Sequence, residues 1–101
     1  MIVLHAVFPI KPDKLDEALD YAEMMVEESN QEAGVIDYRV GTDIQDGNVL
    51  RFFEQYEDGA AMEAHIESDH LAELEAALPD LLAGEPDITQ FEVDSVSDVE
   101  L

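Results

Sequence analysis

The sequence contains no cysteine and no tryptophan, and it carries very little positive charge. Without cysteine the chain has no disulfide, no thiolate metal ligand and no cysteine nucleophile, so a disulfide-stabilised exported scaffold is excluded. Only four residues are lysine or arginine, against 26 aspartates and glutamates, and the formal net charge is −22. Such a chain repels phosphate backbones and anionic lipids, so we expect no nucleic-acid partner and no membrane surface.

The acidic residues are scattered through segments that keep helical or strand periodicity, as on the solvated surface of a folded protein. Concentrated salt weakens their mutual repulsion, because the Debye length falls from ~10 Å at ~0.1 M to ~3 Å at ~1 M. We therefore infer a halophilic source. The N-terminal stretch lacks a basic region and is interrupted by Pro9 and Pro12, unlike a signal peptide or a membrane span, which predicts a cytoplasmic protein.

Length and hydrophobic content together predict one folded domain. A chain of 101 residues has room for one hydrophobic core. Leucine, isoleucine, valine and phenylalanine account for 29 residues, well above the roughly 20% below which an acidic chain is expected to be disordered. We place the domain at residues 1–94 and a short acidic tail at 95–101.

Hydrophobic periodicity predicts four strands and two helical regions. The first helical region carries apolar residues at helical spacing from Leu15 to Val26, with Gly34 as its expected end. The second follows Asp58 as N-cap, leaves open a break near Ser68-Asp69, and ends in stages at Pro79 and Gly84. The predicted strands cover residues 2–10, 35–43, 48–57 and 87–94, and the Asp46-Gly47 pair indicates a hairpin between the second and third.

This order of elements predicts an α+β fold of the ferredoxin-like βαββαβ type, with a four-stranded antiparallel sheet and both helices on one face. The first and third strands have apolar or aromatic residues on both faces, although the helices cover only one. The cover that we expect for the second face is another copy of the chain, which would give a homodimeric α+β barrel.

Histidines are the first candidates for chemistry. His65 lies on the apolar stripe of its helix, where an inward histidine is more often a hydrogen-bonded core residue than a functional one. His70 follows five positions later, roughly 140° around a continuous helix, so the two do not form an obvious ligand pair. They also lack the spacing of an HExxH motif. We therefore predict no metal site.

The third predicted strand offers an acid among aromatics. Leu50, Phe52, Glu54 and Tyr56 share one face of this strand, and Arg51 and Phe53 share the other. A buried carboxylate needs a partner or takes up a proton, and His65 or Arg39 could serve Glu54. A structural ion pair and a catalytic role are equally open for Glu54.

Several short motifs, in order and spacing, resemble the antibiotic biosynthesis monooxygenase (ABM) family, particularly its small quinol-monooxygenase-like members. The resemblance covers about residues 2–93. It is carried by Glu32-Ala33-Gly34 followed by Tyr38, by Phe53-Glu54-Gln55-Tyr56-Glu57-Asp58, and by Ala60-Ala61-Met62 with Ala64-His65-Ile66-Glu67-Ser68-Asp69-His70-Leu71. Ala33 replaces the usual proline and Tyr56 the usual tryptophan, and the absence of tryptophan disfavours the haem-degrading branch.

The resemblance implies a dimeric α+β barrel and a cofactor-independent oxygenation, in which the anion of a small quinol or polyphenol passes an electron to O2. The expected needs are a dry aromatic cavity, a proton acceptor and a donor for the oxyanion. His65 is the expected acceptor, Glu54 orients it, and Arg51 or Tyr38 stabilises the anion. The remaining substrate-binding residues are Phe52, Phe53, Tyr56, Met62 and His70.

Two other function classes stay open on this fold. A noncatalytic dimer that binds a small ligand would need the cavity but not His65. The other class is an isomerase of a small phosphorylated sugar or a lactone. A phosphosugar isomerase would need several basic residues around one cavity, and the chain has only Lys11, Lys14, Arg39 and Arg51.

Overall fold

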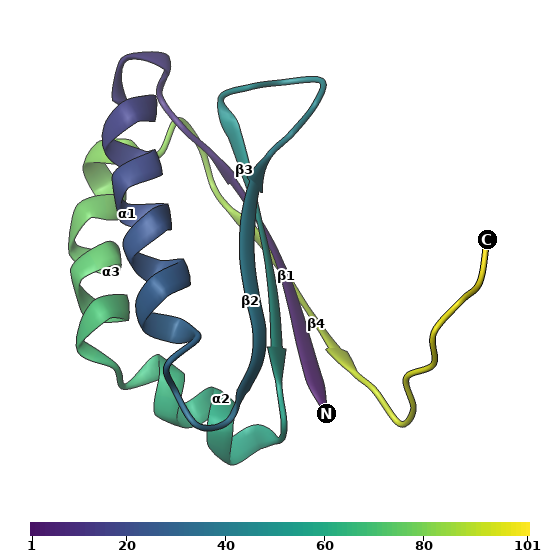
Figure 1. The fold of residues 1–101 in the computed structure, drawn as a ribbon. Helices are drawn as coiled ribbons and strands as arrows, with labels where there is room; N and C mark the ends of the chain where they lie inside the picture. Colours follow the sequence, from purple (N-terminus) through teal and green to yellow (C-terminus); the bar gives the residue numbers. More distant parts are fainter.

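A computed structural model describes all 101 residues as one sheet with helices on one side (Figure 1). The elements in chain order are β1 (Ile2–Pro9), the short 3-10 helix η1 (Pro12–Lys14), α1 (Leu15–Ser29), β2 (Val35–Thr42), β3 (Val49–Tyr56), α2 (Gly59–Ile66), α3 (Asp69–Leu81) and β4 (Asp87–Glu92). The strands are antiparallel in the order β2-β3-β1-β4. This confirms the predicted ferredoxin-like α+β fold.

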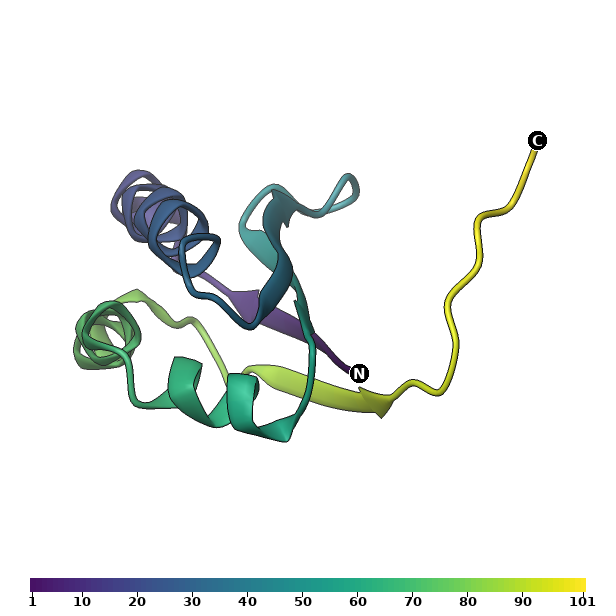
Figure 2. The same ribbon diagram turned by 60° about the horizontal axis from the view of Figure 1, so that its bottom comes forward.

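The sheet packs against the helices through alternate residues of its strands. Figure 2 shows α1 and α3 side by side on the same side of the sheet. In β3 the residues that face the helices are all buried, whereas Arg51 and Phe53 are exposed on the other face. β3 pairs with β1 without a register shift from Ile2–Tyr56 to Pro9–Val49, so the alternation is unbroken.

Helix α1 ends earlier than the sequence predicts. We expected Gly34 to end it, but the helix ends at Ser29 with Asn30 as C-cap. The Asn30 side chain donates to the carbonyl oxygens of Val26 (2.7 Å) and Tyr38 (3.0 Å) and accepts from the Tyr38 N–H (3.2 Å). These bonds connect the end of α1 to β2. The Asn30 side chain therefore takes the place of the glycine C-cap that we expected.

The second helical region is two helices. Asp58 caps α2 as predicted, accepting from the Ala61 N–H at 2.9 Å. Ser68 then caps α3, accepting from the Leu71 N–H at 3.3 Å, so the break that the sequence left open is present. Pro79 does not end the helix, as we expected, but lies inside α3, which continues to Leu81.

The β2–β3 connection is the predicted hairpin, but a side chain organises it. Asp43 accepts from the backbone N–H groups of Gln45 (2.9 Å) and Asp46 (3.1 Å). Gly47 does not have the positive φ of a tight primed turn. The six residues between the strands are therefore held by an aspartate turn rather than by glycine.

The outer sheet face and the C-terminal segment are exposed. Phe53 and Phe91 are 41% and 49% exposed on the face without helices. Residues 95–101 form no helix or strand and extend away from the sheet (Figure 1). No helix has both the length and the apolar character needed to cross a membrane.

Candidate active site

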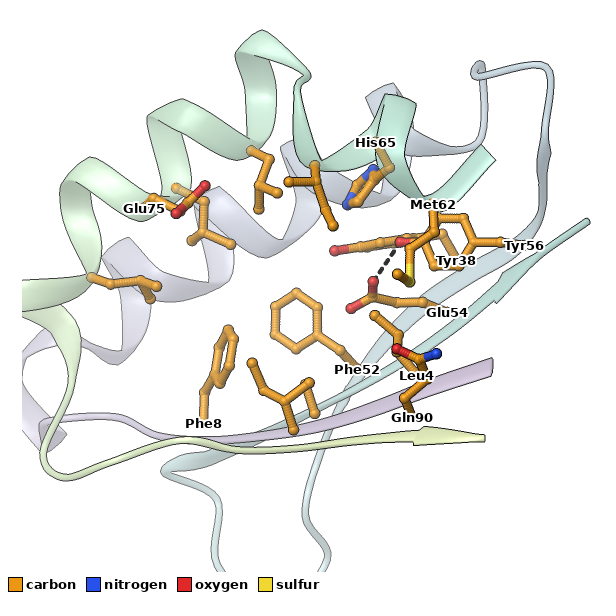
Figure 3. A pocket seen from close by; sticks show the side chains of 16 residues that line it. Leu4, Phe8, Tyr38, Phe52, Glu54, Tyr56, Met62, His65, Glu75 and Gln90 are labelled. Atoms are coloured by element: carbon orange, nitrogen blue, oxygen red, sulfur yellow. Dashed lines mark hydrogen bonds between the residues drawn. The ribbon is translucent and has the colours of Figure 1, made fainter. Parts of the chain in front are cut away.

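A cavity of about 470 Å³ lies between the helix-facing side of the sheet and helices α2 and α3 (Figure 3). Twelve of its sixteen lining residues are hydrophobic. The lining residues are Leu4, Ala6, Phe8, Tyr38, Phe52, Glu54, Tyr56, Met62, His65, Ile66, Leu71, Leu74, Glu75, Leu78, Ile88 and Gln90. This volume and apolar lining fit a small organic ligand.

One end of the cavity is polar, and Glu54 is its centre. The Tyr56 hydroxyl donates to Glu54 Oε1 at 2.5 Å, and both side chains are buried. Burial raises the pKa of Glu54, an effect opposed by the Tyr56 hydrogen bond and by His65. Burial and the Glu54 charge together raise the pKa of the Tyr56 phenol, so Tyr56 stays a hydrogen-bond donor.

Tyr38 forms the wall between Phe52 and His65. Its ring is edge-on to Phe52, with centroids 6.1 Å apart, and tilted against the His65 imidazole at 5.3 Å. Only 1% of Tyr38 is exposed, and burial followed by the Glu54 and Glu32 charges raises the pKa of its phenol. Tyr38 therefore offers a neutral O–H, suited to donate to an oxyanion.

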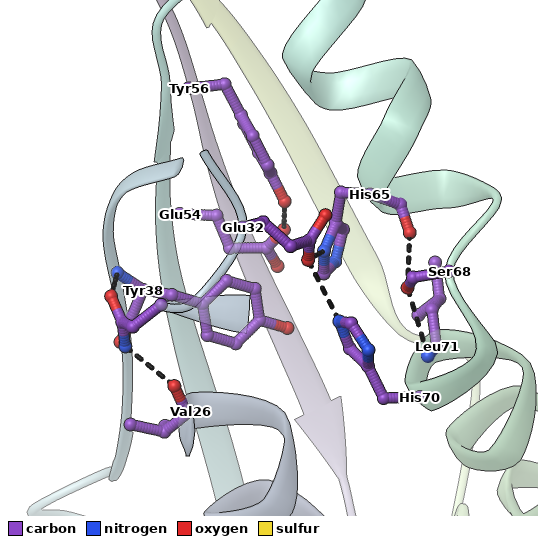
Figure 4. A network of polar contacts seen from close by, with 10 residues as sticks. Val26, Glu32, Tyr38, Glu54, Tyr56, His65, Ser68, His70 and Leu71 are labelled. Atoms are coloured by element: carbon purple, nitrogen blue, oxygen red, sulfur yellow. Dashed lines mark hydrogen bonds and ion pairs between the residues drawn. The ribbon is translucent and has the colours of Figure 1, made fainter. Parts of the chain in front are cut away.

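Two histidines converge on one carboxylate beside this polar end (Figure 4). Glu32 Oε2 lies 2.7 Å from His65 Nδ1 and 2.9 Å from His70 Nε2. A carboxylate accepts only, so each imidazole donates to Glu32 through the nitrogen that faces it, which places a proton on His65 Nδ1. His65 Nε2 makes no hydrogen bond within the chain and is the nitrogen left to accept a proton.

This convergence corrects our expectation that His65 and His70 do not pair. The expectation assumed a continuous helix, in which five residues separate the two side chains by roughly 140°. The chain instead leaves α2 after Ile66, and the Ser68 hydroxyl donates to the His65 carbonyl oxygen at 2.6 Å while capping α3. The change of direction brings the two imidazole centroids to 5.6 Å.

Gly34 allows the loop with Glu32 to lie against α2. A Cβ on Gly34 would lie far inside van der Waals contact with the Ala61 Cβ, so only glycine permits this approach. The Val35 N–H donates to the Glu32 carbonyl oxygen at 3.2 Å, which closes the turn. The glycine that we expected to end α1 therefore positions the Glu32 carboxylate instead.

The partner of His65 is also different from the expected one. We predicted that Glu54 orients His65, but His65 Nδ1 is bonded to Glu32 and Glu54 accepts from Tyr56. Glu32 was missed as a site residue. Its only sequence signal was its place in the Glu32-Ala33-Gly34 motif, because hydrophobic periodicity carries no information about a polar loop residue.

Arg51 and Phe53 do not line this cavity. Both lie on the outer sheet face, where Arg51 is bonded to Asp43 at 2.7 Å and lies 3.3 Å from His5. The unbroken β1–β3 register leaves no bulge that could turn either side chain inward, which corrects their predicted place in the cavity of this chain. Tyr38, Phe52, Glu54, Tyr56, Met62 and His65 do meet at the cavity. His70 does not line the cavity, and its Nε2 is hydrogen-bonded to Glu32.

Comparison with known proteins gives a consistent picture. Residues 1–81 match the family model described as antibiotic biosynthesis monooxygenase. The chain is 32% identical over 93 residues to a Bacillus subtilis (strain 168) protein named "Putative monooxygenase YcnE", covering 92% of this chain and 98% of that protein.

Solved structures share the fold along nearly the whole chain. A conserved protein from Methanosarcina mazei Go1 is 29% identical, with a TM-score of 0.86 and 92% of each chain covered. A protein from Deinococcus radiodurans, described as a "putative antibiotic biosynthesis monooxygenase", has a TM-score of 0.91 at 18% identity, with 99% of each chain covered. At that identity the second likeness shows the fold alone.

Proposed function

Since the chain belongs to the antibiotic biosynthesis monooxygenase family, we propose that it oxygenates a small quinol or polyphenol with O2, without a metal or prosthetic group. The observation that carries this proposal is the His65 imidazole, which lines an apolar cavity with Nδ1 held by Glu32 and Nε2 unbonded. An imidazole held in this way is oriented to accept a phenolic proton.

The reaction starts with transfer of a phenolic proton to His65 Nε2. The resulting anion is electron-rich and passes one electron to O2; the two radicals combine, and loss of water leaves a hydroxylated quinone. Quinol and O2 thus give hydroxyquinone and water, with all four electrons supplied by the substrate. Tyr38 and Tyr56 are the neutral donors beside the developing oxyanion, and the apolar walls keep water away from the radical pair.

The lining charges disfavour the phosphosugar isomerase alternative. Glu54 and Glu75 are the carboxyl groups that line the cavity, and no lysine or arginine lines it. A phosphorylated metabolite would meet negative charge without a compensating cation. The cavity suits a neutral aromatic ligand, which both the oxygenase and the noncatalytic binding alternative require.

Oxygen uptake tests the proposal directly. The protein is mixed anaerobically with a panel of neutral hydroquinones, air is admitted, and oxygen consumption and hydroxyquinone formation are followed. We expect uptake above the autoxidation rate that depends on His65 and Glu32. The matched control is Glu28→Gln, which removes one exposed carboxylate from α1. Binding of hydroquinones without any uptake would instead favour the noncatalytic alternative.

We also propose a cytoplasmic homodimer that pairs through the outer sheet face. The partly exposed Phe53 and Phe91 lie on that face, which no helix of the chain covers. Sedimentation in concentrated salt should give twice 11.2 kDa. A Phe53→Glu variant should sediment as a monomer, and a wild-type monomer at micromolar concentration would contradict the dimer.

A further inference from the structure

We propose that Glu32, His65 and His70 bind one divalent transition-metal ion of the zinc type, and that the bound ion blocks His65 as a proton acceptor. The binding half of this proposal stands on the geometry of the three residues alone. The blocking half rests on the proposed function. The two halves are therefore tested by separate measurements.

The donor atoms are already close enough to share an ion. One atom from each residue lies within 4.8 Å of the others, and Glu32 Oε2 is 2.7 Å and 2.9 Å from the two imidazole nitrogens. Ligands of a tetrahedral Zn²⁺ at ~2.1 Å are about 3.4 Å apart, so the Glu32 oxygen must move about half an ångström away from each imidazole nitrogen, and the two imidazole nitrogens, which lie within 4.8 Å of each other, must adjust to the same spacing. Two imidazoles and a carboxylate suit Zn²⁺ and its neighbours rather than Mg²⁺ or Ca²⁺, which prefer oxygen ligands.

The three ligands come from separate elements that hold them in place. His65 lies in the last turn of α2 and His70 in the first turn of α3, and the Ser68 hydroxyl donates to the His65 carbonyl oxygen between the two helices. Glu32 is supplied by the loop that Gly34 lets approach α2. The side chains of His65, His70 and Glu32 are 4%, 14% and 19% exposed, so the site is largely shielded and Glu32 gives water and an ion a way in.

Charge favours a cation at this place. Glu32 has no lysine or arginine partner, and its ion-pair partners are the two histidines. Three of the four basic side chains are paired elsewhere, Lys14 with Glu17, Arg39 with Asp37 and Arg51 with Asp43. A chain with a net charge of −22 also concentrates cations around itself. No positive side chain therefore competes with an ion for the Glu32 carboxylate.

Metal binding changes which nitrogen of His65 carries the proton. The ion takes the lone pair of Nδ1, the nitrogen that otherwise donates to Glu32, so the ring proton moves to Nε2. The cavity-facing nitrogen then donates and cannot accept a phenolic proton. Since the ion binds on the Nδ1 side of the ring, beside Glu32, it blocks the base without entering the cavity.

Calorimetry of the full chain after dialysis against a chelator tests the binding half, with ZnCl2 as titrant. We expect one ion per chain, and about 10- to 100-fold weaker binding or more in Glu32→Gln and in His70→Asn. Visible absorption of bound Co²⁺ should change in the same variants. Glu28→Gln removes the same charge from an exposed position and should bind as the wild type does.

The outcomes separate the two halves. Zinc binding that is equal in wild type, Glu32→Gln and His70→Asn would mean diffuse binding to surface carboxylates and would overturn the site, as would the absence of binding. Zinc should inhibit oxygen uptake over the same concentrations at which it binds, and chelator should restore uptake. Zinc that binds there and raises oxygen uptake would overturn the blocking half. If no hydroquinone supports uptake, the proposed function fails while calorimetry still decides the site.

Discussion

The two faces of strand β3 hold their ionisable side chains in different environments. On the outer face Arg51 is paired with Asp43 in an exposed ion pair, and Asp43 has its pKa lowered mainly by that hydrogen bond. On the inner face Glu54 has a tyrosine hydroxyl instead of a cation, and its pKa is raised by burial. The two faces also differ in burial, since Phe52 on the inner face is 2% exposed and Phe53 on the outer face is 41% exposed.

The difference shows where the fold concentrates chemistry. Exposed ion pairs are solvated and contribute little to stability, about 0 to 1 kcal/mol. Buried carboxylates without a cation are costly and persist where surrounding structure holds them. The inner face places one such group, Glu54, beside the cavity, and the outer face leaves Phe53 and Phe91 partly exposed.

The largest expected effect separates His65 from Arg51. His65→Asn should lower oxygen uptake by about 10²- to 10⁴-fold, the usual contribution of a general base. Arg51→Ala should leave uptake nearly unchanged, because its side chain lies on the other face. Circular dichroism of both variants controls for folding. A large loss of uptake in Arg51→Ala with the fold intact would mean that the outer face contributes to the site.

The second effect compares two glycines. Gly34→Ala forces a Cβ into Ala61 and should destabilise the protein by about 1–3 kcal/mol while pushing Glu32 away from His65. A Cβ on Gly41 in β2 meets nothing within 4 Å, so Gly41→Ala should change the melting temperature little. The double variant Gly34→Ala/Ala61→Gly removes the clash and should recover most of the stability. Thermal melts and oxygen uptake measure both consequences, and a failure of the double variant to recover would refute the steric explanation.

The third effect is a pH dependence on the inner face. Burial raises the pKa of Glu54 above the ordinary value of ~4.3, so the folded state is favoured while Glu54 is protonated. This stabilisation is lost as the pH rises through the pKa of Glu54 in the folded protein. Glu54→Gln should therefore raise the melting temperature more near about pH 8 than near about pH 5. The control Glu57→Gln removes an exposed carboxylate. A gain in Glu57→Gln with the same pH dependence would assign the effect to net charge instead of burial.

The smallest and most diffuse effect concerns exposed charge. The melting temperature should be higher in ~2 M KCl than in ~0.1 M KCl, because salt screens repulsion among the surface carboxylates. The increment should be equal in wild type and Glu54→Gln, since a buried group is screened little. An equal or higher melting temperature at low salt would defeat the halophilic interpretation.

Hydrophobic periodicity was enough to predict the architecture, because it indicates which residues are buried. The alternation in β3 predicted that Glu54 and Arg51 point to opposite faces, and both do. The Asp58 cap and the Asp46-Gly47 hairpin were likewise local signals with local consequences. The end of α1 was misplaced because the Asn30 side chain bonds the Val26 carbonyl oxygen at the helix end and also bonds Tyr38, eight residues away in sequence.

The sequence by itself determined the order of elements, the buried face of β3 and the net charge of −22. Only the tertiary structure decided that His65 and His70 share Glu32, since this needs the turn at Ser68 and the approach of the Gly34 loop to α2. Periodicity indicates which residues of a helix or strand face the core. It holds no information on which polar groups, distant along the chain, meet there, because that depends on the angles between packed elements.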